Sequence, residues 1–582
     1  MVHKIHIPVM GICYTADTPI RVAHLGITSV ISLVDDGLLE EYRMAYAERL
    51  GLDLGSPQTT RIGRIRSYLD FVADEVECKF ARLCAERFDG ASNKDLYFRM
   101  LPLDSRLRVE YDGLFAKVGL ARLAAEAALT EKMEPGEIQA NIMVGLNHDE
   151  AAFDAVRGFA ASKVKGSLVL SAGVNLAVFE EIAKCKDFYR TSGKAPSKKI
   201  ILKVSDYRSA LIQGRYLAKK GLEVHEYRIE SGVNCGGHAF FESKKLLLDV
   251  VREFVSKRDE LFQTTRGMIA KFASSMANAP VQDIVPPASP SRLTAQGGLC
   301  SPEDIETVMS LGVDGVGVGT PFLLVPQATS MDKETRRMLM AAAPDDIYIS
   351  HASPLEIPFV NLRTSTAANL CREKVREFFA PQGEKTGVPE LQPGFPCRQH
   401  YLCRQVPGFD HPVCMASREY VLRRLAEIDR LEQDELCVIS NGSSSITTAP
   451  QSFSTEGRES IVSCACSRDV HEKYDALRRL TLERECICRF LGNAGREEIR
   501  EKSPSLHFQP ECVAVARGSQ PARVREPVTI CPNPDIGYFN REYSLEEMMC
   551  HLYGTGTRLT PKDKPSAFEI EAAILSKLGK LC

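Results

Sequence analysis

Eight short apolar runs, each followed by helical sequence, constrain the fold of this chain more than any other feature. The runs are rich in β-branched residues and nearly continuous, which is typical of parallel strands buried on both faces. Helical segments such as 149–162, 175–188 and 301–312 separate them. The predicted strands are 3–10, 27–34, 138–145, 166–173, 198–205, 222–229, 291–298 and 313–320. This alternation predicts an α/β fold, a (β/α)8 TIM barrel, with an open doubly wound sheet as the alternative.

Two insertions and a tail extend this repeat. Residues 37–135, between the second and third strands, are mostly helical, and a shorter helical insertion spans 243–276. The segment 386–397, TGVPELQPGFPC, is rich in proline and glycine and indicates a boundary. We therefore expect a barrel domain over 1–385 and a smaller, irregular, cysteine-rich C-terminal domain over 386–582.

The composition excludes several classes of protein. A chain of 582 residues is too long for one ordinary core, so more than one domain is expected. The net charge of -3 gives no basic surface for nucleic acid or an acidic membrane. No apolar run reaches the roughly 18 residues that a membrane span needs, and the first residues lack a signal-peptide pattern. We expect a cytoplasmic protein without nucleic-acid or membrane partners, and the sequence leaves a homo-oligomer open.

Two glycine motifs, AQGGL and DGVGVGTPF, stand at the ends of the seventh and eighth predicted strands. In a barrel, the loops after these two strands commonly bind a phosphate group. Glycines let backbone N–H groups face the phosphate, and a following helix N-terminus adds positive charge. The alternative is that the glycines only form tight turns. Because both motifs occur, with a helix between them, the pattern favours phosphate binding by Gly297, Gly298, Gly317, Gly319 and Thr320.

The run LTAQGGLCSPEDIETVMSLGVDGVGVGTPFLL, residues 293–324, resembles the flavin-phosphate site of an FMN-dependent barrel family. That family includes nitronate monooxygenase, formerly 2-nitropropane dioxygenase, and the flavin-dependent enoyl reductase of fatty-acid synthesis. Inosine monophosphate dehydrogenase is similar at a greater distance. The resemblance covers about residues 3–330, without the insertion at 37–135. It implies that FMN binds at the C-terminal face of the barrel, with its phosphate at the glycine motifs.

Shorter matches along the barrel add residues beside the flavin ring. They occur in IPVMG, QANIMV, ILKVSDYRSAL and NCGGHAF, which follow the order of the nitronate monooxygenase strands. By this resemblance, the residues that line the cofactor are Val9, Met10, Gly11, Asn141, Lys203, Ser205, Gly236 and Gly237. The chain departs from the family pattern at Asn234, Cys235 and Phe240, which bears on the substrate more than on the cofactor.

Two residues carry the catalytic expectation. His238 follows a glycine pair at a strand end, where a group with a near-neutral pKa can transfer a proton beside the flavin. The alternative is a loop histidine hydrogen-bonded to a carbonyl. Lys203 can stabilise negative charge on a reduced ring, or it can extend into solvent.

The resemblance implies an FMN-dependent oxidoreductase that oxidises an activated carbon acid, such as a nitronate, with dioxygen or another electron acceptor. Two alternatives remain open. One is an NAD(P)H-dependent flavin reductase of enoyl thioesters or quinones. The other is an electron-transfer or scaffold subunit that docks a partner through its C-terminal domain.

Cysteines are concentrated in the tail, which holds 12 of the 19 in a third of the chain. In a reducing compartment such density favours a metal site or buried thiols over disulfides. The spacings match neither zinc ribbons nor the usual ferredoxin runs. Two Cys-x-Cys pairs, and cysteines beside prolines, nevertheless suggest an iron–sulfur cluster or zinc. The expected ligands are Cys397, Cys486, Cys488 and Cys531.

Overall fold

The computed structural model covers the whole chain and describes most of it. The described residues are 2–144, 149–171, 173–232, 238, 245–275, 281–397, 403–443, 465–503 and 525–578. All statements below concern these residues.

Eight parallel strands form a closed barrel in which neighbours along the chain are also neighbours in space. The strands are β1 (Ile5–Ile7), β2 (Thr28–Ser32), β3 (Ile138–Met143), β4 (Ser167–Ser171), β5 (Lys199–Val204), β6 (Glu226–Ile229), β7 (Arg292–Gln296) and β8 (Gly315–Gly317). Each lies inside a predicted run, and the pairing of β8 with β1 excludes the open sheet. The (β/α)8 prediction is confirmed.

The last strand is short and glycine-rich because the barrel closes tightly there. Ile5 of β1 pairs with Val316, between the two glycines of β8. A Cβ on Gly315 would stand 2.6 Å from the Lys4 carbonyl oxygen, closer than real side chains come. A Cβ on Gly317 would stand 2.7 Å from Gln296 Oε1. These glycines are therefore needed for barrel closure, whatever they bind.

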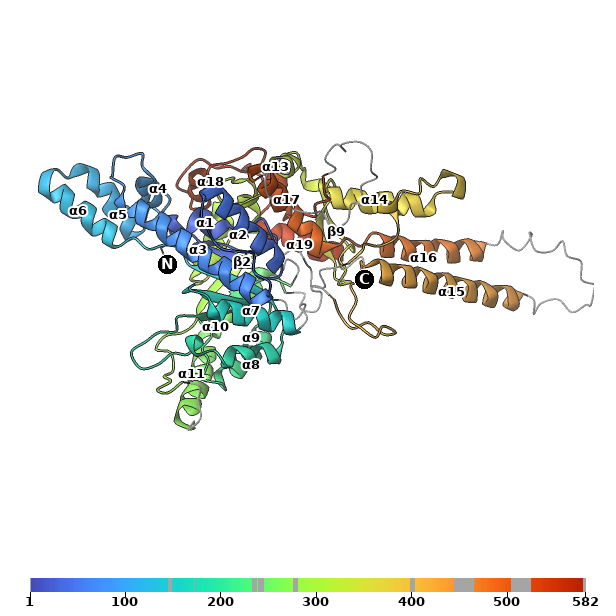
Figure 1. Cartoon of the computed structure of the whole chain (residues 1–582), viewed down its shortest axis with the longest axis horizontal. Helices are drawn as coiled ribbons and strands as arrows, with labels where there is room; N and C mark the ends of the chain where they lie inside the picture. Colours follow the sequence, from blue (N-terminus) through green and yellow to red (C-terminus); the bar gives the residue numbers. More distant parts are fainter. Residues whose placement is uncertain are drawn as a thin grey trace, which may run out of the picture.

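Helices follow the strands as the sequence predicts, and both insertions are helical (Figure 1). The helices of the barrel are α1 (Thr18–Val22), α7 (Asp149–Ala161), α8 (Leu176–Ala183), α9 (Tyr207–Ala218) and α12 (Pro302–Ser310). The insertions contribute α2 (Asp36–Leu50), α3 (Arg61–Ala85), α4 (Asn93–Arg99), α5 (Arg106–Asp112), α6 (Gly119–Glu131), α10 (Leu247–Ser256) and α11 (Arg258–Ser275). Ser301 caps α12 as expected, with Pro302 at its first position.

The tail is helical and packs on the barrel. Its helices are α15 (Arg418–Ser443), α16 (Ala465–Leu482), α17 (Ile487–Lys502), α18 (Leu545–Leu552) and α19 (Ala567–Leu578). Between β8 and the tail lie α13 (Lys333–Met340), a hairpin of β9 (Ile347–Ser350) and β10 (Phe359–Leu362), and α14 (Thr366–Phe379), all before residue 385. The expectation of an irregular tail thus understates its helix content. The pair α15 and α16 runs side by side, away from the barrel (Figure 1). The domain boundary at 385 stays a prediction.

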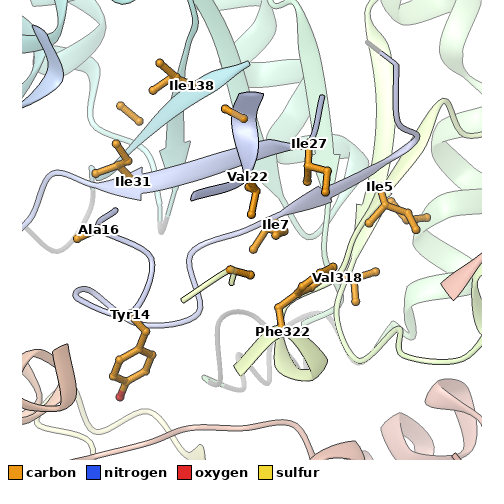
Figure 2. Close-up of a cluster of buried hydrophobic side chains, with 14 of the residues drawn as sticks. Ile5, Ile7, Tyr14, Ala16, Val22, Ile27, Ile31, Ile138, Val318 and Phe322 are labelled. Carbon is orange, nitrogen blue, oxygen red and sulfur yellow. The ribbon is translucent and has the colours of Figure 1, made fainter. Parts of the chain in front are cut away.

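Two contacts tie the end of the chain to the barrel. Arg496 of α17 forms ion pairs with Asp35 at 3.1 Å and with Glu41 at 3.0 Å. Tyr14, after β1, lies apart from the aliphatic strand residues in Figure 2, and its hydroxyl donates to the Thr529 carbonyl at 2.7 Å. Tail residues such as Ile530 also belong to the same hydrophobic core as the strands. Residues 525–578 therefore complete the barrel's own core.

The barrel interior contains a buried ion pair beside a small aliphatic cluster of Val30, Val169 and Ile201. Arg228 Nη2 lies 2.7 Å from Glu226 Oε1, with both side chains at most 2 % exposed. Gln139 accepts a further bond from Arg228, and Thr294 donates to Glu226. Burial alone raises the pKa of Glu226, but Arg228 and other basic groups outweigh it and lower that pKa to about 2. Among the described residues, no helix combines the length and apolar composition needed to cross a bilayer.

The ion pair predicts the effect of removing its acid. Glu226→Gln leaves Arg228 buried without a counter-charge, which costs about 3 kcal/mol of unfolding free energy at neutral pH. Because the folded pKa is about 2 and the ordinary value is 4.5, this contribution is present above about pH 4.5 and disappears toward pH 2. Denaturant titration at both pH values measures it. Glu373→Gln, at an exposed pair with Arg376, is the control and should cost less than about 1 kcal/mol; equal costs would contradict the prediction.

Candidate functional site

Four side chains from different strands meet at the carboxyl ends of the barrel strands. Lys203 of β5 places Nζ 3.0 Å from Oε2 of Glu230, the residue after β6. Gln296, the last residue of β7, donates from Nε2 to the other oxygen of Glu230. Asn141 lies near the same end of β3 and is 8 % exposed. The mouth of the barrel therefore has a polar, charge-balanced floor. The sequence did not predict Glu230 or Gln296 as site residues. An acidic residue at the end of an apolar run could have indicated Glu230.

A small pocket of about 100 Å³ opens beside this floor, at the ends of β7 and β8. It is large enough for a group of phosphate size, but not for a nucleotide. Its lining includes seven predicted cofactor residues: Val9, Met10, Gly297, Gly298, Gly317, Gly319 and Thr320. Gly297 and Gly298 have φ angles of 124° and 75°, a conformation that favours glycine. The structure thus brings the predicted phosphate residues together, with Glu230 and Gln296 at the inner end of the pocket.

The tail closes the outer side of this pocket, which the sequence did not predict. Cys531, Asn533 and Asp535 contribute to its lining. The backbone N–H of Asn533 donates to Thr320 Oγ1 at 3.1 Å, which leaves the Thr320 hydroxyl proton for another acceptor. Asp535 lies 2.7 Å from Lys564 Nζ, with both side chains at most 1 % exposed. Burial raises the pKa of Asp535 to about 6, although Lys564 opposes the shift.

His238 is held by the hairpin of β9 and β10. Its Nε2 lies 3.2 Å from Ser353 Oγ, and its ring stacks on Phe359 with centroids 5.6 Å apart. The two backbones also form an antiparallel bridge. Ser353 Oγ accepts a bond from the Leu355 backbone, so the hydroxyl is fixed in turn. A histidine from the barrel is therefore oriented by residues beyond the region of family resemblance.

The remaining predicted residues have other positions. Gly11 is buried, and a Cβ there would meet the Tyr14 ring at 2.3 Å, so its role in the structure is close packing. Ser205 is half-buried and directly precedes Asp206, the N-cap of α9. Neither residue lines the glycine pocket. Gly236 and Gly237 lie outside the described residues, as do Asn234, Cys235 and Phe240.

The predicted metal ligands do not gather in one place. Cys397 and Cys486 share a cluster with other cysteines, and Cys488 packs against Ile487 and Leu355. Cys531 instead lines the glycine pocket. Within the described ranges, no group of three or more His, Cys, Asp or Glu side chains is placed to hold a metal ion. The set of four that the sequence suggested is therefore unsupported as a metal site.

The residues present fit FMN at both ends of the site. At the phosphate end, a Cβ on Gly319 would stand 3.1 Å from Met10 Cγ, so a side chain at this position requires Met10 to shift. Backbone N–H groups and the Thr320 hydroxyl are the donors that a phosphate needs. At the ring end, Lys203 and Asn141 stand at the strand ends where a ring continuing from that phosphate must lie. Two carboxyl groups line this pocket, and each has a basic partner: Glu230 pairs with Lys203, and Asp535 pairs with Lys564.

Filling the cradle should weaken FMN binding. Gly319→Val adds branched carbons where even a Cβ is tight against Met10, so FMN affinity should fall by at least about tenfold, measured by quenching of FMN fluorescence. Gly383→Val is the control, because a Cβ at Gly383 meets nothing within 4 Å. Wild-type affinity in Gly319→Val would remove this pocket from the phosphate site.

No protein-family model and no curated protein matches this chain. Solved structures with low similarity include the enoyl reductase domain of MlnA from the macrolactin biosynthesis cluster of Bacillus amyloliquefaciens. It has 14 % identity and a TM-score of 0.34 over 80 % of this chain and 87 % of that one.

Two further structures are similar at the same low level. FabK from Thermotoga maritima has 18 % identity and a TM-score of 0.26, over 46 % of this chain and 66 % of that one. Nitroalkane oxidase from Streptomyces ansochromogenes has 11 % identity and a TM-score of 0.27, over 62 % and 76 %. Such values are too low to support an argument about function, which rests on the residues of this chain.

Proposed function

We propose that this protein is an FMN-dependent oxidoreductase that oxidises an activated carbon acid, such as a nitronate, with dioxygen as the electron acceptor. One observation carries the proposal: Glu230, which lines the glycine pocket, is paired with Lys203 at the same end of the barrel. A phosphate site next to a charged floor suits a cofactor whose phosphate is anchored while its ring lies over the strand ends.

FMN, when bound, supplies the two-electron oxidation chemistry that amino-acid side chains lack. The chain's own residues supply binding and charge. Gly298, Gly319 and Thr320 hold the phosphate, and Asn533 fixes the Thr320 hydroxyl. Lys203 presents a positive charge at the ring end, and its contact with Glu230 holds the ammonium in place. That charge favours electron-rich states near the strand ends.

When the substrate enters as a neutral carbon acid, such as a nitroalkane, His238 is proposed to accept the proton from its carbon. The ring is partly exposed and held on one side by Ser353 and Phe359, so its orientation is fixed before substrate binds. The contact between Nε2 and Ser353 Oγ sets the orientation of the imidazole ring that is proposed to transfer the proton. A small molecule with an acidic C–H bond is the class of substrate that this arrangement suits.

Replacing the base tests its role. His238→Ala should lower kcat/KM for a neutral nitroalkane by about 100-fold or more, because general-base catalysis is worth that much, while FMN stays bound. His411→Ala, at a histidine exposed to solvent and paired with Asp410, should leave turnover unchanged. Turnover at the wild-type rate in His238→Ala would exclude this histidine from the mechanism.

The electron donor separates this proposal from the flavin-reductase alternative. Purified protein should be yellow and carry FMN, and anaerobic mixing with a nitronate should bleach the flavin absorption. NAD(P)H should bleach it far more slowly. Fast reduction by NAD(P)H and none by nitronates would favour an enoyl or quinone reductase, and a colourless protein that takes up no FMN would overturn the cofactor itself.

A further inference from the structure

Cysteines from three separate segments converge beside the mouth of the barrel. Cys397, Cys403 and Cys414 all come from the segment before α15. Cys486 is the N-cap of α17. They pack in one apolar cluster with Cys371 of α14. Phe395 and Phe490 cover this cluster edge to face, with ring centroids 5.2 Å apart. Cysteines from distant parts of the chain thus share one enclosed space.

Four of these side chains form the inner set. Cys403 is hydrogen-bonded to Cys397, and Cys414 and Cys488 are the next thiols within electrostatic range of it. Cys414 also has Cys397 as a neighbour. The set therefore combines Cys397, Cys403, Cys414 and Cys488, of which the sequence suggested only the first and the last. It replaces Cys486 and Cys531 with two cysteines whose spacing matched no known motif.

Four converging thiols limit the kinds of ligand that this site can bind. Sets of four cysteines bind zinc or iron–sulfur clusters, because soft thiolates prefer these centres over hard cations. A zinc ion draws all four sulfurs onto one atom, whereas a cubane cluster bonds each sulfur to a different iron and keeps the four apart. The set spans two apolar clusters, with Cys397, Cys403 and Cys414 in one and Cys488 in the other, which suits a centre of several irons more than a single ion.

The position of this set links it to the barrel. Cys488 packs with Leu355 and Ile487, and Met143 at the end of β3 packs against the same group. Met143 is two residues beyond Asn141, at the strand ends where the ring of FMN is proposed to lie. The surroundings are otherwise apolar, and such burial is one of the features that set the potential of a cluster.

We propose that Cys397, Cys403, Cys414 and Cys488 bind an iron–sulfur cluster of the four-iron, four-sulfide type. The proposal goes beyond the oxidoreductase function and does not depend on it, since the cysteines bind the cluster whether or not FMN is present. The chain would then hold its cluster in the tail and next to the barrel mouth.

Metal and sulfide analysis of the full-length protein tests the proposal. Protein purified without oxygen, or reconstituted with ferrous iron and sulfide, should contain about four irons and four sulfides per chain. Reduction with dithionite should then give an electron paramagnetic resonance signal of a cluster, which flavin does not produce. Less than about one iron per chain under both conditions, zinc in its place, or a Cys397–Cys403 disulfide found by mass spectrometry would each overturn it.

Matched variants assign the ligands. Cys414→Ser and Cys403→Ser should each lose more than about half of the iron, since each removes one of four ligands. Cys371→Ser is the control, because Cys371 is a buried cysteine of the same cluster that lies outside the inner set. Circular dichroism checks that each variant is folded. If a variant does not fold, the iron content of the wild-type protein decides whether a cluster is bound. Full iron in both ligand variants, or equal loss in Cys371→Ser, would contradict the assignment.

Discussion

Closure of the sheet by β8 on β1 is the constraint on which the rest of this structure depends. Parallel strands that close into a barrel bring all their carboxyl ends to one face. For that reason Lys203 and Glu230, which are remote from the glycine motifs in sequence, lie beside them in space. Closure also requires a strand without side chains at Gly315 and Gly317. One of these two glycines, Gly317, also lines the pocket.

The buried ion pair makes the mouth a fixed platform. Glu226 and Arg228 fill the barrel below the mouth with a buried ion pair, and Gln139 and Thr294 complete its hydrogen bonds. A ring placed over the strand ends would meet the paired charges of Lys203 and Glu230 together with Val9, which packs on the aliphatic cluster inside the barrel. Buried charges of this kind lose much of their solvation, so partners must be held in good geometry. The platform is thus rigid for an electrostatic reason.

The sequence predicted those features that local patterns encode. The strands follow from apolar runs of fixed length, and the glycine pocket from two motifs that closure brings together. It did not predict Ser353 beside His238 or Asn533 beside Thr320, because each contact joins segments more than a hundred residues apart. Nothing in the local sequence of the tail marks which barrel residue it will meet. Glu230 lies between these two cases. The sequence shows that it ends an apolar run, but it does not show that Glu230 pairs with Lys203.

The tail cysteines also show that local sequence does not reveal contacts between distant segments. Their positions bear on how the tail should be studied. Spacing and neighbouring prolines drew attention to Cys531, but the Tyr14–Thr529 and Asn533–Thr320 contacts carry that segment to the glycine pocket instead. Because residues 525–578 also complete the barrel core, cutting the chain near 386 would remove core packing and one wall of the pocket together. Loss of flavin after such a truncation would therefore not identify the tail as a separate docking module. Point variants that leave the core intact are the ones that distinguish its roles.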